Sequence, residues 1–329
     1  MVFISNFRDD AERKKYLIRS QVGSEFIDGF RINMSGVYGR LKIINTDTHE
    51  LLTTKGRRKA KKQFLSATKW AVDNGAKVVL LAASTKRLFG RDAKELKEKF
   101  PNTIFTIGDN GTAHLLLLDT LEAIKRVGLT KEKATIVVLG ATGILGKIMV
   151  ELLSQKGYTV VAVSNNMERL ENLQEKYKVK TCASLEALKE VDLLVACTHK
   201  KGMLLTKNSI LSMKRKDSKL VVVDVAEPAN LSEEIYAENK MMVTRQDAGN
   251  AYSKNISFVL GALSYKKLSL SKGVIFGCFA EAMTIAWAMK NNHNTNWFNV
   301  SVENMEMIAS YFEELDISNP SPRCFGELV

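Results

Sequence analysis

The chain has 329 residues, of which 45% are hydrophobic and only four are proline, a composition typical of one large or two ordinary well-cored domains. This composition excludes a disordered chain, and the longest apolar runs fall far short of the roughly 20 residues of a membrane-spanning helix. The net charge of +12 favours an acidic partner. Because the first residues lack the basic-then-apolar order of a signal peptide, we expect a cytoplasmic protein with at most peripheral membrane contact.

The cysteines and the basic clusters bear on metal binding and on possible partners. Cys182, Cys197, Cys278 and Cys324 show no metal-ligand spacing, so we expect neither a metal site nor disulfides. Lysine and arginine gather at residues 55–62 and 214–216. These clusters fit an acidic carrier protein, nucleic acid or a membrane surface, and they equally fit a solvated face.

From about residue 60, helices and strands alternate between glycine and proline punctuation, which predicts a parallel sheet. The pattern ends in a long helix, followed by a charged segment that we interpret as a hinge between domains. In chain order the expected elements are a helix over 58–75, a strand over 77–83, a helix over 92–100, a strand over 102–108, a helix over 111–128 and the hinge over 129–133.

A second α/β unit of about the size of one domain follows. Its expected elements are strands over 134–140, 158–164, 192–198 and 219–226, and helices over 141–157 and 167–177. Helices over 278–290 and 301–315 then return to the first domain, as in many two-domain α/β enzymes. The predicted fold is therefore α/β, with a substrate domain over 1–130, a Rossmann-like doubly wound dinucleotide-binding domain over 131–265 and C-terminal helices over 266–329.

A glycine-rich turn in "VVLGATGILGKIM" connects a buried strand to an apolar-faced helix. Small residues let the backbone approach a pyrophosphate, whose charge is held by the free N–H groups of the helix. The next strand ends in neutral residues, where NAD-binding proteins carry an acidic one, and this favours NADPH. The residues expected to bind the cofactor are Gly140, Thr142, Gly143, Ile144, Gly146, Ser164, Asn165, Arg169 and Thr198.

Cys278 follows a glycine and precedes the helical run "FAEAM". A helix N-terminus stabilises a thiolate, which makes a thiol nucleophilic, and the same N–H groups can hold an oxyanion. Packing is the alternative role of this cysteine. Glu281, three residues later, caps its own helix or takes part in proton transfer.

The stretch "FGCFAEAMTIAW" followed by "NVSVENMEMIASYFEEL" resembles the C-terminal signature of the long-chain acyl-(acyl carrier protein) reductases, the aldehyde-forming enzymes of cyanobacterial alkane synthesis. "TIGDNGTAH", "VVLGATGILG", "MERLENLQ" and "VDVAEPANL" are similar to other parts of that family, so the resemblance covers most of the chain. Asn165 stands where the family has an arginine. The resemblance implies that Cys278 accepts the acyl group.

The implied reaction transfers an acyl group from a thioester, on an acidic carrier protein or coenzyme A, to Cys278, and NADPH then reduces it to an aldehyde. Expected proton donors are His114 and Tyr252. Expected substrate contacts are Ser84, Thr112, Asp224 and Pro228, although a rigid loop would explain the last two equally well.

Three other functions fit the sequence. A glutamyl-tRNA-reductase-like enzyme would use an N-terminal cysteine, whereas Cys182 is the first cysteine here, so we expect no specific nucleic-acid partner. A dehydrogenase of the shikimate or amino-acid type would transfer hydride directly and leave Cys278 as packing. A dinucleotide sensor would bind NAD(P) without catalysis.

Overall fold

The structure is a computed structural model that describes residues 1–16, 23–90, 92–289 and 296–329. These residues form two compact units: unit 1 comprises Met1–Gly111 and Ala251–Ser318, and unit 2 comprises Thr112–Asn250 and Asn319–Val329. None of the helices in the described ranges is both long and apolar enough to cross a membrane.

The unit boundaries differ from the expected positions 130 and 265. The first boundary lies inside the long helix α4 (Asp109–Arg126), not in the charged segment after it. The reason is packing: the first turn of α4 contacts unit 1 through Gly111, whereas Asp119 and Arg126 make their hydrogen bonds in unit 2. The last eleven residues, 319–329, belong to unit 2 and not to the unit that holds the C-terminal helices.

Unit 1 is built on a six-stranded mixed sheet with the order β13-β2-β3-β1-β4-β5. Strands β3, β1, β4 and β5 run parallel, and β2 and β13 are antiparallel additions at one edge. Its strands are β1 (Val2–Phe7), β2 (Phe26–Met34), β3 (Val37–Asp47), β4 (Val78–Leu81), β5 (Ile104–Thr106), β13 (Ile256–Phe258), and the pair β12 (Asn250–Tyr252) with β14 (Val274–Phe276). Its helices are α1 (Asp10–Tyr16), η2 (Glu50–Leu52), α2 (Thr54–Asp73), η3 (Ala83–Arg87), α3 (Lys94–Lys99), α9 (Ala262–Leu268), α10 (Gly277–Ala288) and α11 (Val302–Glu314).

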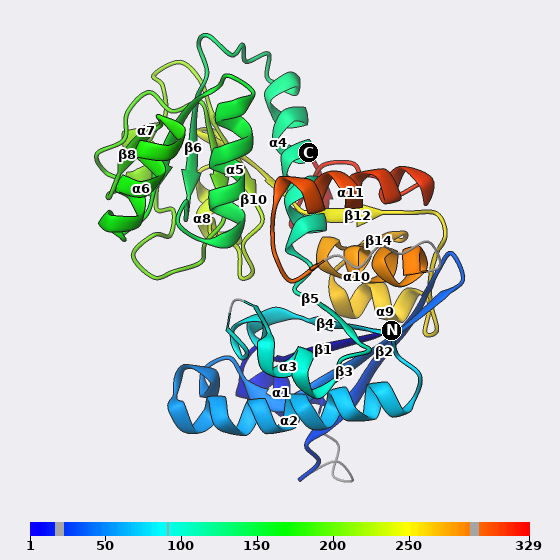
Figure 1. The fold of residues 1–329 in the computed structure, drawn as a ribbon. Coiled ribbons are helices and arrows are strands. Elements are labelled where there is room, and N and C mark those ends of the chain that lie inside the picture. Colours follow the sequence, from blue (N-terminus) through cyan, green and yellow to red (C-terminus); the bar gives the residue numbers. More distant parts are fainter. Residues whose placement is uncertain (17–22, 91, 290–295) are drawn as a thin grey trace. The chain divides into compact units, whose positions relative to one another are not determined.

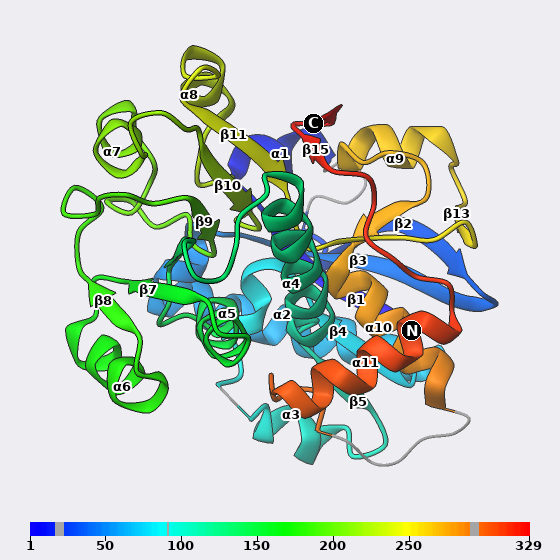
Figure 2. The ribbon, with the colours of Figure 1, turned by 90° about the horizontal axis from the view of Figure 1, so that it is seen from above.

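Alternating residues of β1 explain how this sheet is covered on both faces. Val2 and Ile4 belong to the core that includes Phe64 of α2, whereas Phe3 points the other way and packs on Phe279 of α10, with ring centroids 4.5 Å apart. Figure 1 shows α2 and α10 on opposite faces of the sheet, and α10 packs over β3 and β4 (Figure 2). The expected helix over 278–290 corresponds to α10, although Lys290 lies outside the described residues.

Unit 2 contains a six-stranded, all-parallel sheet with the order β8-β7-β6-β9-β10-β11. This is the Rossmann order, in which the chain reverses direction across the sheet between β6 and β9. The strands are near-continuous runs of Val, Leu and Ile because both faces are covered. The elements are β6 (Thr135–Leu139), α5 (Ile144–Gln155), β7 (Thr159–Val163), α6 (Met167–Tyr177), β8 (Lys180–Cys182), β9 (Leu193–Ala196), α7 (Lys207–Met213), β10 (Leu220–Asp224), α8 (Glu233–Glu238), β11 (Val243–Asp247), β15 (Arg323–Cys324) and β16 (Glu327–Leu328).

The two faces of this sheet have different partners. Residues Val137 and Leu139 of β6 share a core with Ile210 and Met213 of α7, while α5 packs beside α6 (Figure 2). The predicted fold class, with one Rossmann-like sheet and a second α/β unit completed by late helices, is confirmed.

Candidate active site

Cys278 is the second residue of α10 and is half-buried. The N-cap position, Phe276, provides no side-chain cap, so the first N–H groups of the helix are not used by a capping side chain. One of them, the N–H of Phe279, is directed at the Cys278 sulfur. The thiol therefore lies at a helix N-terminus, as the sequence predicts.

Two glycines bring the start of α4 against the start of α10. A β-carbon on Gly108 would lie 2.2 Å from Cβ and 2.5 Å from Cα of Cys278, and one on Gly111 would lie 2.9 Å from Cβ of Glu281. Gly108 also has a φ of +74°, which side-chain-bearing residues rarely adopt. The close approach of the two helices thus depends on glycine at both positions.

Lys86 places a positive charge beside Cys278. This residue lies on η3, directly after β4, and its Nζ is 2.5 Å from Oδ1 of Asp109, the first residue of α4. Burial alone lowers the pKa of Lys86, but the carboxylate of Asp109 and the neighbouring Cys278 and Glu281 outweigh it, so the pKa is raised. Lys86 is therefore an ammonium group next to the candidate nucleophile.

Glu281 does not cap its own helix, which corrects one of the two expected roles. Its carboxylate is fully buried, and it accepts hydrogen bonds from the N–H of Gly111, at 2.6 Å, and from the hydroxyl of Thr106. It therefore caps the neighbouring helix α4. Burial raises the pKa of Glu281 to about 7, against the effect of both hydrogen bonds. This buried carboxyl group is poised between its two protonation states near neutral pH.

The expected thiolate is not the form that the structure favours. Burial raises the pKa of Cys278 to about 11; the ammonium of Lys86 lowers it, and the carboxylates of Asp109 and Glu281 raise it further. The helix N-terminus lowers the pKa, as predicted, but burial of the thiol outweighs this effect. At neutral pH Cys278 is a protonated thiol, so an attack by its sulfur would require this proton to leave.

The pKa of Glu281 predicts how stability depends on pH. The folded pKa of about 7 exceeds the ordinary 4.5, so the folded state binds this proton more tightly than the unfolded chain. The stabilisation is complete below pH 4.5 and is lost as the pH rises through 7, with a loss of about 2 kcal/mol between pH 5 and pH 8. In Glu281→Gln this component disappears, and urea unfolding at the two pH values measures the difference from wild type. Parallel pH profiles of the two proteins would contradict this account.

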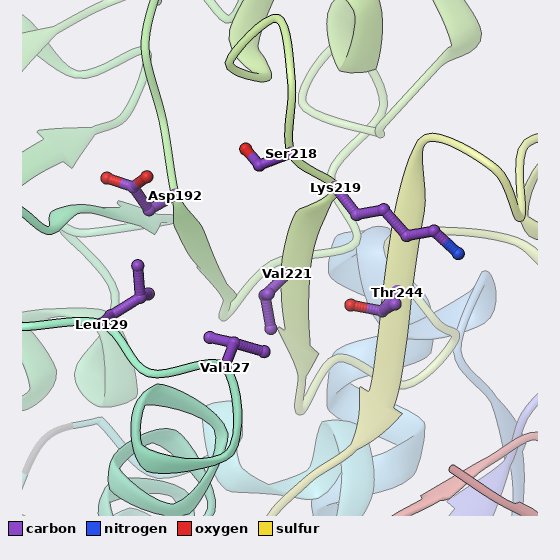
Figure 3. Close-up of a pocket in the computed structure, with 7 residues that line it drawn as sticks. All are labelled: Val127, Leu129, Asp192, Ser218, Lys219, Val221 and Thr244. Atoms are coloured by element: carbon purple, nitrogen blue, oxygen red, sulfur yellow. The ribbon is translucent and has the colours of Figure 1, made fainter.

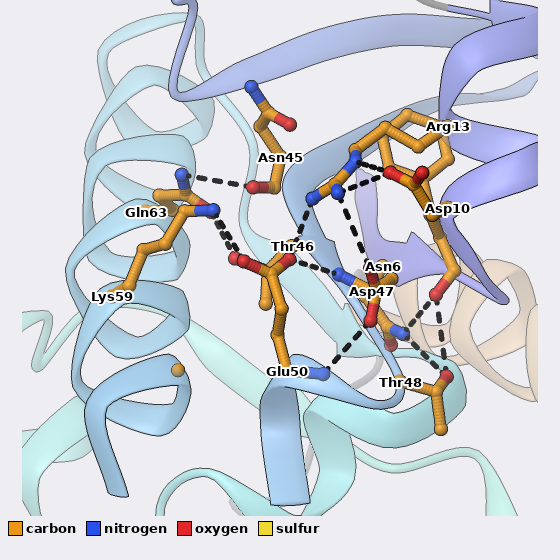
Figure 4. Close-up of polar contacts among 12 residues, drawn as sticks. Asn6, Asp10, Arg13, Asn45, Thr46, Asp47, Thr48, Glu50, Lys59 and Gln63 are labelled. Carbon is orange, nitrogen blue, oxygen red and sulfur yellow. Dashed lines mark hydrogen bonds and ion pairs between the residues drawn. The ribbon is translucent and has the colours of Figure 1, made fainter. Parts of the chain in front are cut away.

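A network of polar side chains lies where β1 and β3 end (Figure 4). Arg13 bonds Asp10 and Glu50, and Lys59 reaches the other oxygen of Glu50 at 2.9 Å. Ser84, expected to contact substrate, lies next to this network: its N–H donates to Asn6, and its hydroxyl is 3.3 Å from that of Thr48. Ser84 and Lys86 lie on the same short helix, η3.

The glycine turn of unit 2 has the geometry of a dinucleotide cradle. Gly140 has a φ of +83°, and a β-carbon there would lie 2.8 Å from Cβ of Thr198, which follows the neighbouring strand β9. A β-carbon on Gly146 would lie 2.2 Å from the carbonyl oxygen of Gly140. The N-cap of α5 is Gly143, which has no side chain, so the helix N-terminus is open to an anion beside Ile144. The turn therefore fits a pyrophosphate at the carboxyl edge of the sheet, at the point where the strand order reverses.

The remaining cofactor residues also lie at this edge. Thr142 and Ser164 bond each other through their hydroxyl groups at 2.7 Å, and Arg169 is exposed in the first turn of α6. Sequence reasoning missed Lys200, whose Nζ donates to Oδ1 of Asn165 at 3.1 Å. The sequence feature that could have identified it is the pair of adjacent lysines, Lys200 and Lys201, that follows β9. Lys200 therefore places a positive charge beside Asn165, after the end of β7.

Of the other predicted residues, Thr112 and His114 lie in unit 2 and Tyr252 lies in unit 1. His114 is half-buried and Thr112 is buried on α4, where Thr112 packs against Gly249. Their expected roles stay predictions, as does that of Tyr252, which pairs with Ser318 through the backbone.

Asp224 organises a loop. Its carboxylate accepts the N–H groups of Ala226, Asn230 and Leu231 and pairs with the buried Arg245 at 3.2 Å. Its oxygens are thus engaged within unit 2, which matches the rigid-loop alternative. Pro228, in the same loop, is exposed, and its contact with substrate stays a prediction.

A cavity of about 240 Å³ in unit 2 lies away from the glycine turn (Figure 3). Its lining includes Asp192, Lys219 and Thr244, which lie before or at the start of β9, β10 and β11, at the amino edge of the sheet. Ligands of such sheets bind at the opposite, carboxyl edge, so we do not assign the cofactor to this cavity. Within the described ranges, no group of three or more His, Cys, Asp or Glu residues could hold a metal ion.

Comparison with known proteins gives matches to oxidoreductases. The Shikimate / quinate 5-dehydrogenase family matches residues 122–248, which lie in unit 2. The long-chain acyl-[acyl-carrier-protein] reductase of Synechococcus elongatus is 24% identical over 270 residues, covering 79% of this chain and 76% of that protein.

Solved structures are similar at low identity. L-tryptophan dehydrogenase from Nostoc punctiforme is 10% identical, with a TM-score of 0.48 and coverage of 95% of this chain and 80% of that one. Shikimate 5-dehydrogenase from Thermus thermophilus is 13% identical, with a TM-score of 0.40 and coverage of 96% and 100%. The sequence matches place this chain among the NAD(P)-dependent oxidoreductases, with a shikimate-dehydrogenase-like nucleotide-binding unit.

Proposed function

We propose that this protein reduces an acyl thioester to an aldehyde through an acyl group carried on Cys278. The observation that carries the proposal is the environment of that thiol: a helix N-terminus without a side-chain cap and the ammonium of Lys86 both face it. The sequence similarity to an acyl-[acyl-carrier-protein] reductase supports the same conclusion. The substrate is an acyl thioester on a carrier protein or coenzyme A.

Acyl transfer requires the Cys278 proton to leave. As the sulfur attacks the thioester carbon, a new carbon–sulfur bond forms and the donor's carbon–sulfur bond breaks. The proton lost by Cys278 ends on the departing thiol, so the exchange needs no other reactant. The ammonium of Lys86 stabilises the sulfur as it becomes anionic, and the N–H groups at the start of α10 stabilise the oxyanion.

The glycine turn fits NADPH because a β-carbon would fill the space at Gly140 and Gly146 and because α5 begins without a side-chain cap. The pyrophosphate would be held by the turn and the start of α5, and a 2′-phosphate by Lys200. When bound, NADPH supplies the hydride that reduces the acyl group to the aldehyde.

Aldehyde formation from acyl thioesters of increasing chain length, with NADPH or NADH, tests this function. We expect aldehyde with NADPH, and we expect Lys200→Gln to raise KM for NADPH about tenfold by removing a charged phosphate contact, with KM for NADH unchanged. Lys201→Gln, which alters the next exposed lysine, is the matched control. Equal changes with both cofactors would contradict the role of Lys200, and the absence of aldehyde with every donor would contradict the function.

A second function is favoured by the match to shikimate / quinate 5-dehydrogenases and by the protonated state of Cys278. In that case the partly buried Lys86–Asp109 pair would exchange a proton with a substrate hydroxyl while hydride moves directly to or from the cofactor. Such an enzyme does not form an acyl-cysteine, so the mass of the protein after exposure to thioester separates the two functions.

A further inference from the structure

A small pocket in unit 1 combines two arginines with two hydroxyl groups. It has a volume of about 150 Å³, and its polar lining consists of Thr48, Arg57, Ser84 and Arg87. The rest of the lining is apolar and is contributed by three leucines from η2 and from the end of η3. No acidic side chain is among these lining residues, so the pocket carries a net positive charge.

The acidic residues nearby are already paired. Arg13 and Lys59 hold the two oxygens of Glu50, and Arg13 also approaches Asp47 at 3.6 Å. By contrast, within the described residues neither Arg57 nor Arg87 has a carboxylate oxygen within 4.0 Å. The two guanidinium groups are therefore available to an external anion.

Part of the pocket is held in a fixed orientation. Arg57 donates from Nε to the carbonyl of Leu51 at 3.1 Å and from Nη2 to that of Leu52 at 3.3 Å, which leaves Nη1 for a ligand. On the other side, the N–H of Ala82, the residue before η3, donates to the carbonyl of Ile4 at 2.8 Å and fixes η3 to β1. Planar guanidinium groups match the oxygens of a phosphate, and an ordered one loses less entropy on binding.

The helix η3 connects this pocket to the candidate nucleophile. Ser84 and Arg87 of η3 line the pocket, while Lys86, between them, faces Asp109 and Cys278. A ligand that places a thioester at Cys278 and a phosphate at Arg87 would therefore follow a single rigid element. Phosphopantetheine has this form, with sulfur at one end and a phosphate ester at the other, and it carries the acyl group in both coenzyme A and carrier proteins.

We propose that the pocket formed by Thr48, Arg57, Ser84 and Arg87 binds the phosphate ester of the acyl donor's phosphopantetheine. The proposal rests on the proposed function and adds to it a recognition site for the donor. The basic segment at residues 55–62, which the catalytic chemistry does not use, thereby supplies one of its two arginines.

Donors with and without the phosphate test the proposal in full-length protein. The variant is Arg87→Gln, and Arg58→Gln is the matched control, because Arg58 is an exposed arginine of the same basic segment that does not line the pocket. The donors are S-acyl phosphopantetheine, S-acyl pantetheine without phosphate, acyl-coenzyme A and an acyl-carrier protein. Arg87→Gln is expected to lower kcat/KM about tenfold for the phosphate-containing donors and to leave S-acyl pantetheine unchanged.

Comparing the loss of kcat/KM with acyl-coenzyme A and with the acyl-carrier protein shows which of these two donors the pocket recognises. An equal loss with S-acyl pantetheine, or no loss with any donor, would overturn the proposal. Calorimetric titration of phosphopantetheine itself measures binding without acyl transfer. The proposal predicts that phosphopantetheine binds wild type and Arg58→Gln equally well and binds Arg87→Gln about tenfold more weakly. If phosphopantetheine does not bind, or binds all three proteins equally, the proposed phosphate pocket is wrong. If it binds as predicted but Cys278 is never acylated, only the proposed function is wrong.

Discussion

Replacing Cys278 by serine is expected to reduce aldehyde formation at least about a thousandfold, because the attacking atom is lost while the rest of the site remains. A serine hydroxyl is less acidic than even this raised thiol, so Lys86 and the helix N-terminus have no comparable anion to stabilise. The substitution exchanges one atom at a half-buried position, so the free energy of unfolding should change by less than about 1 kcal/mol.

Steady-state aldehyde assays and urea unfolding measure both quantities. Cys324→Ser is the control, since Cys324 is a free cysteine of unit 2 outside the candidate active site. Its activity should remain within about twofold of wild type. If Cys278→Ser retained turnover, Cys278 would not carry the acyl group, and direct hydride transfer involving the Lys86–Asp109 pair would become the better account.

Replacing Gly108 by alanine is expected to destabilise the protein by about 3 kcal/mol. The new methyl group would lie 2.2 Å from Cβ of Cys278, and the backbone would be strained by its φ of +74°. Relief of the clash requires α10 to move away from the start of α4. We therefore expect acyl transfer to fall even at temperatures where the variant is folded.

The variant Gly75→Ala distinguishes the two effects expected in Gly108→Ala, the backbone strain at a positive φ and the steric clash of the new methyl group. Gly75 also has a positive φ, +82°, but a β-carbon there meets nothing within 4 Å, so this variant should lose only about 1 kcal/mol and keep its activity. Urea unfolding and the aldehyde assay on both variants make the comparison. Equal destabilisation of the two variants would mean that the contact between Gly108 and Cys278 is not tight.

Local patterns in the sequence were sufficient to predict the first helices and strands of unit 2. Buried strands rich in Val and Leu, separated by an amphipathic helix and a glycine turn, predict β6, α5 and β7, and the helix expected over 167–177 coincides with α6 (Met167–Tyr177). The antiparallel pair β2 and β3 was not predicted, because its half-buried strands lack a continuous apolar run. Pairing between distant strands, such as β1 with β3, leaves no local signal.

The site shows the same division between local and long-range effects. The position of Cys278 at the start of a helix follows from the neighbouring residues, and so does the cradle around Gly140. The ammonium of Lys86 and the carboxylate of Asp109 come from the ends of other elements, so the sequence could not predict their effect on the Cys278 pKa. For the same reason, Glu281 was expected to cap its own helix, whereas the close packing at Gly111 lets it cap α4.

The covalent step can be measured without any cofactor. Purified protein is mixed with acyl thioesters of several chain lengths, and its intact mass is then recorded alongside that of Cys278→Ala. Our account predicts that wild type gains the mass of one acyl group, located on the peptide containing Cys278, and that the alanine variant gains none. An unmodified wild-type protein with every donor, or an equal gain in Cys278→Ala, would contradict it.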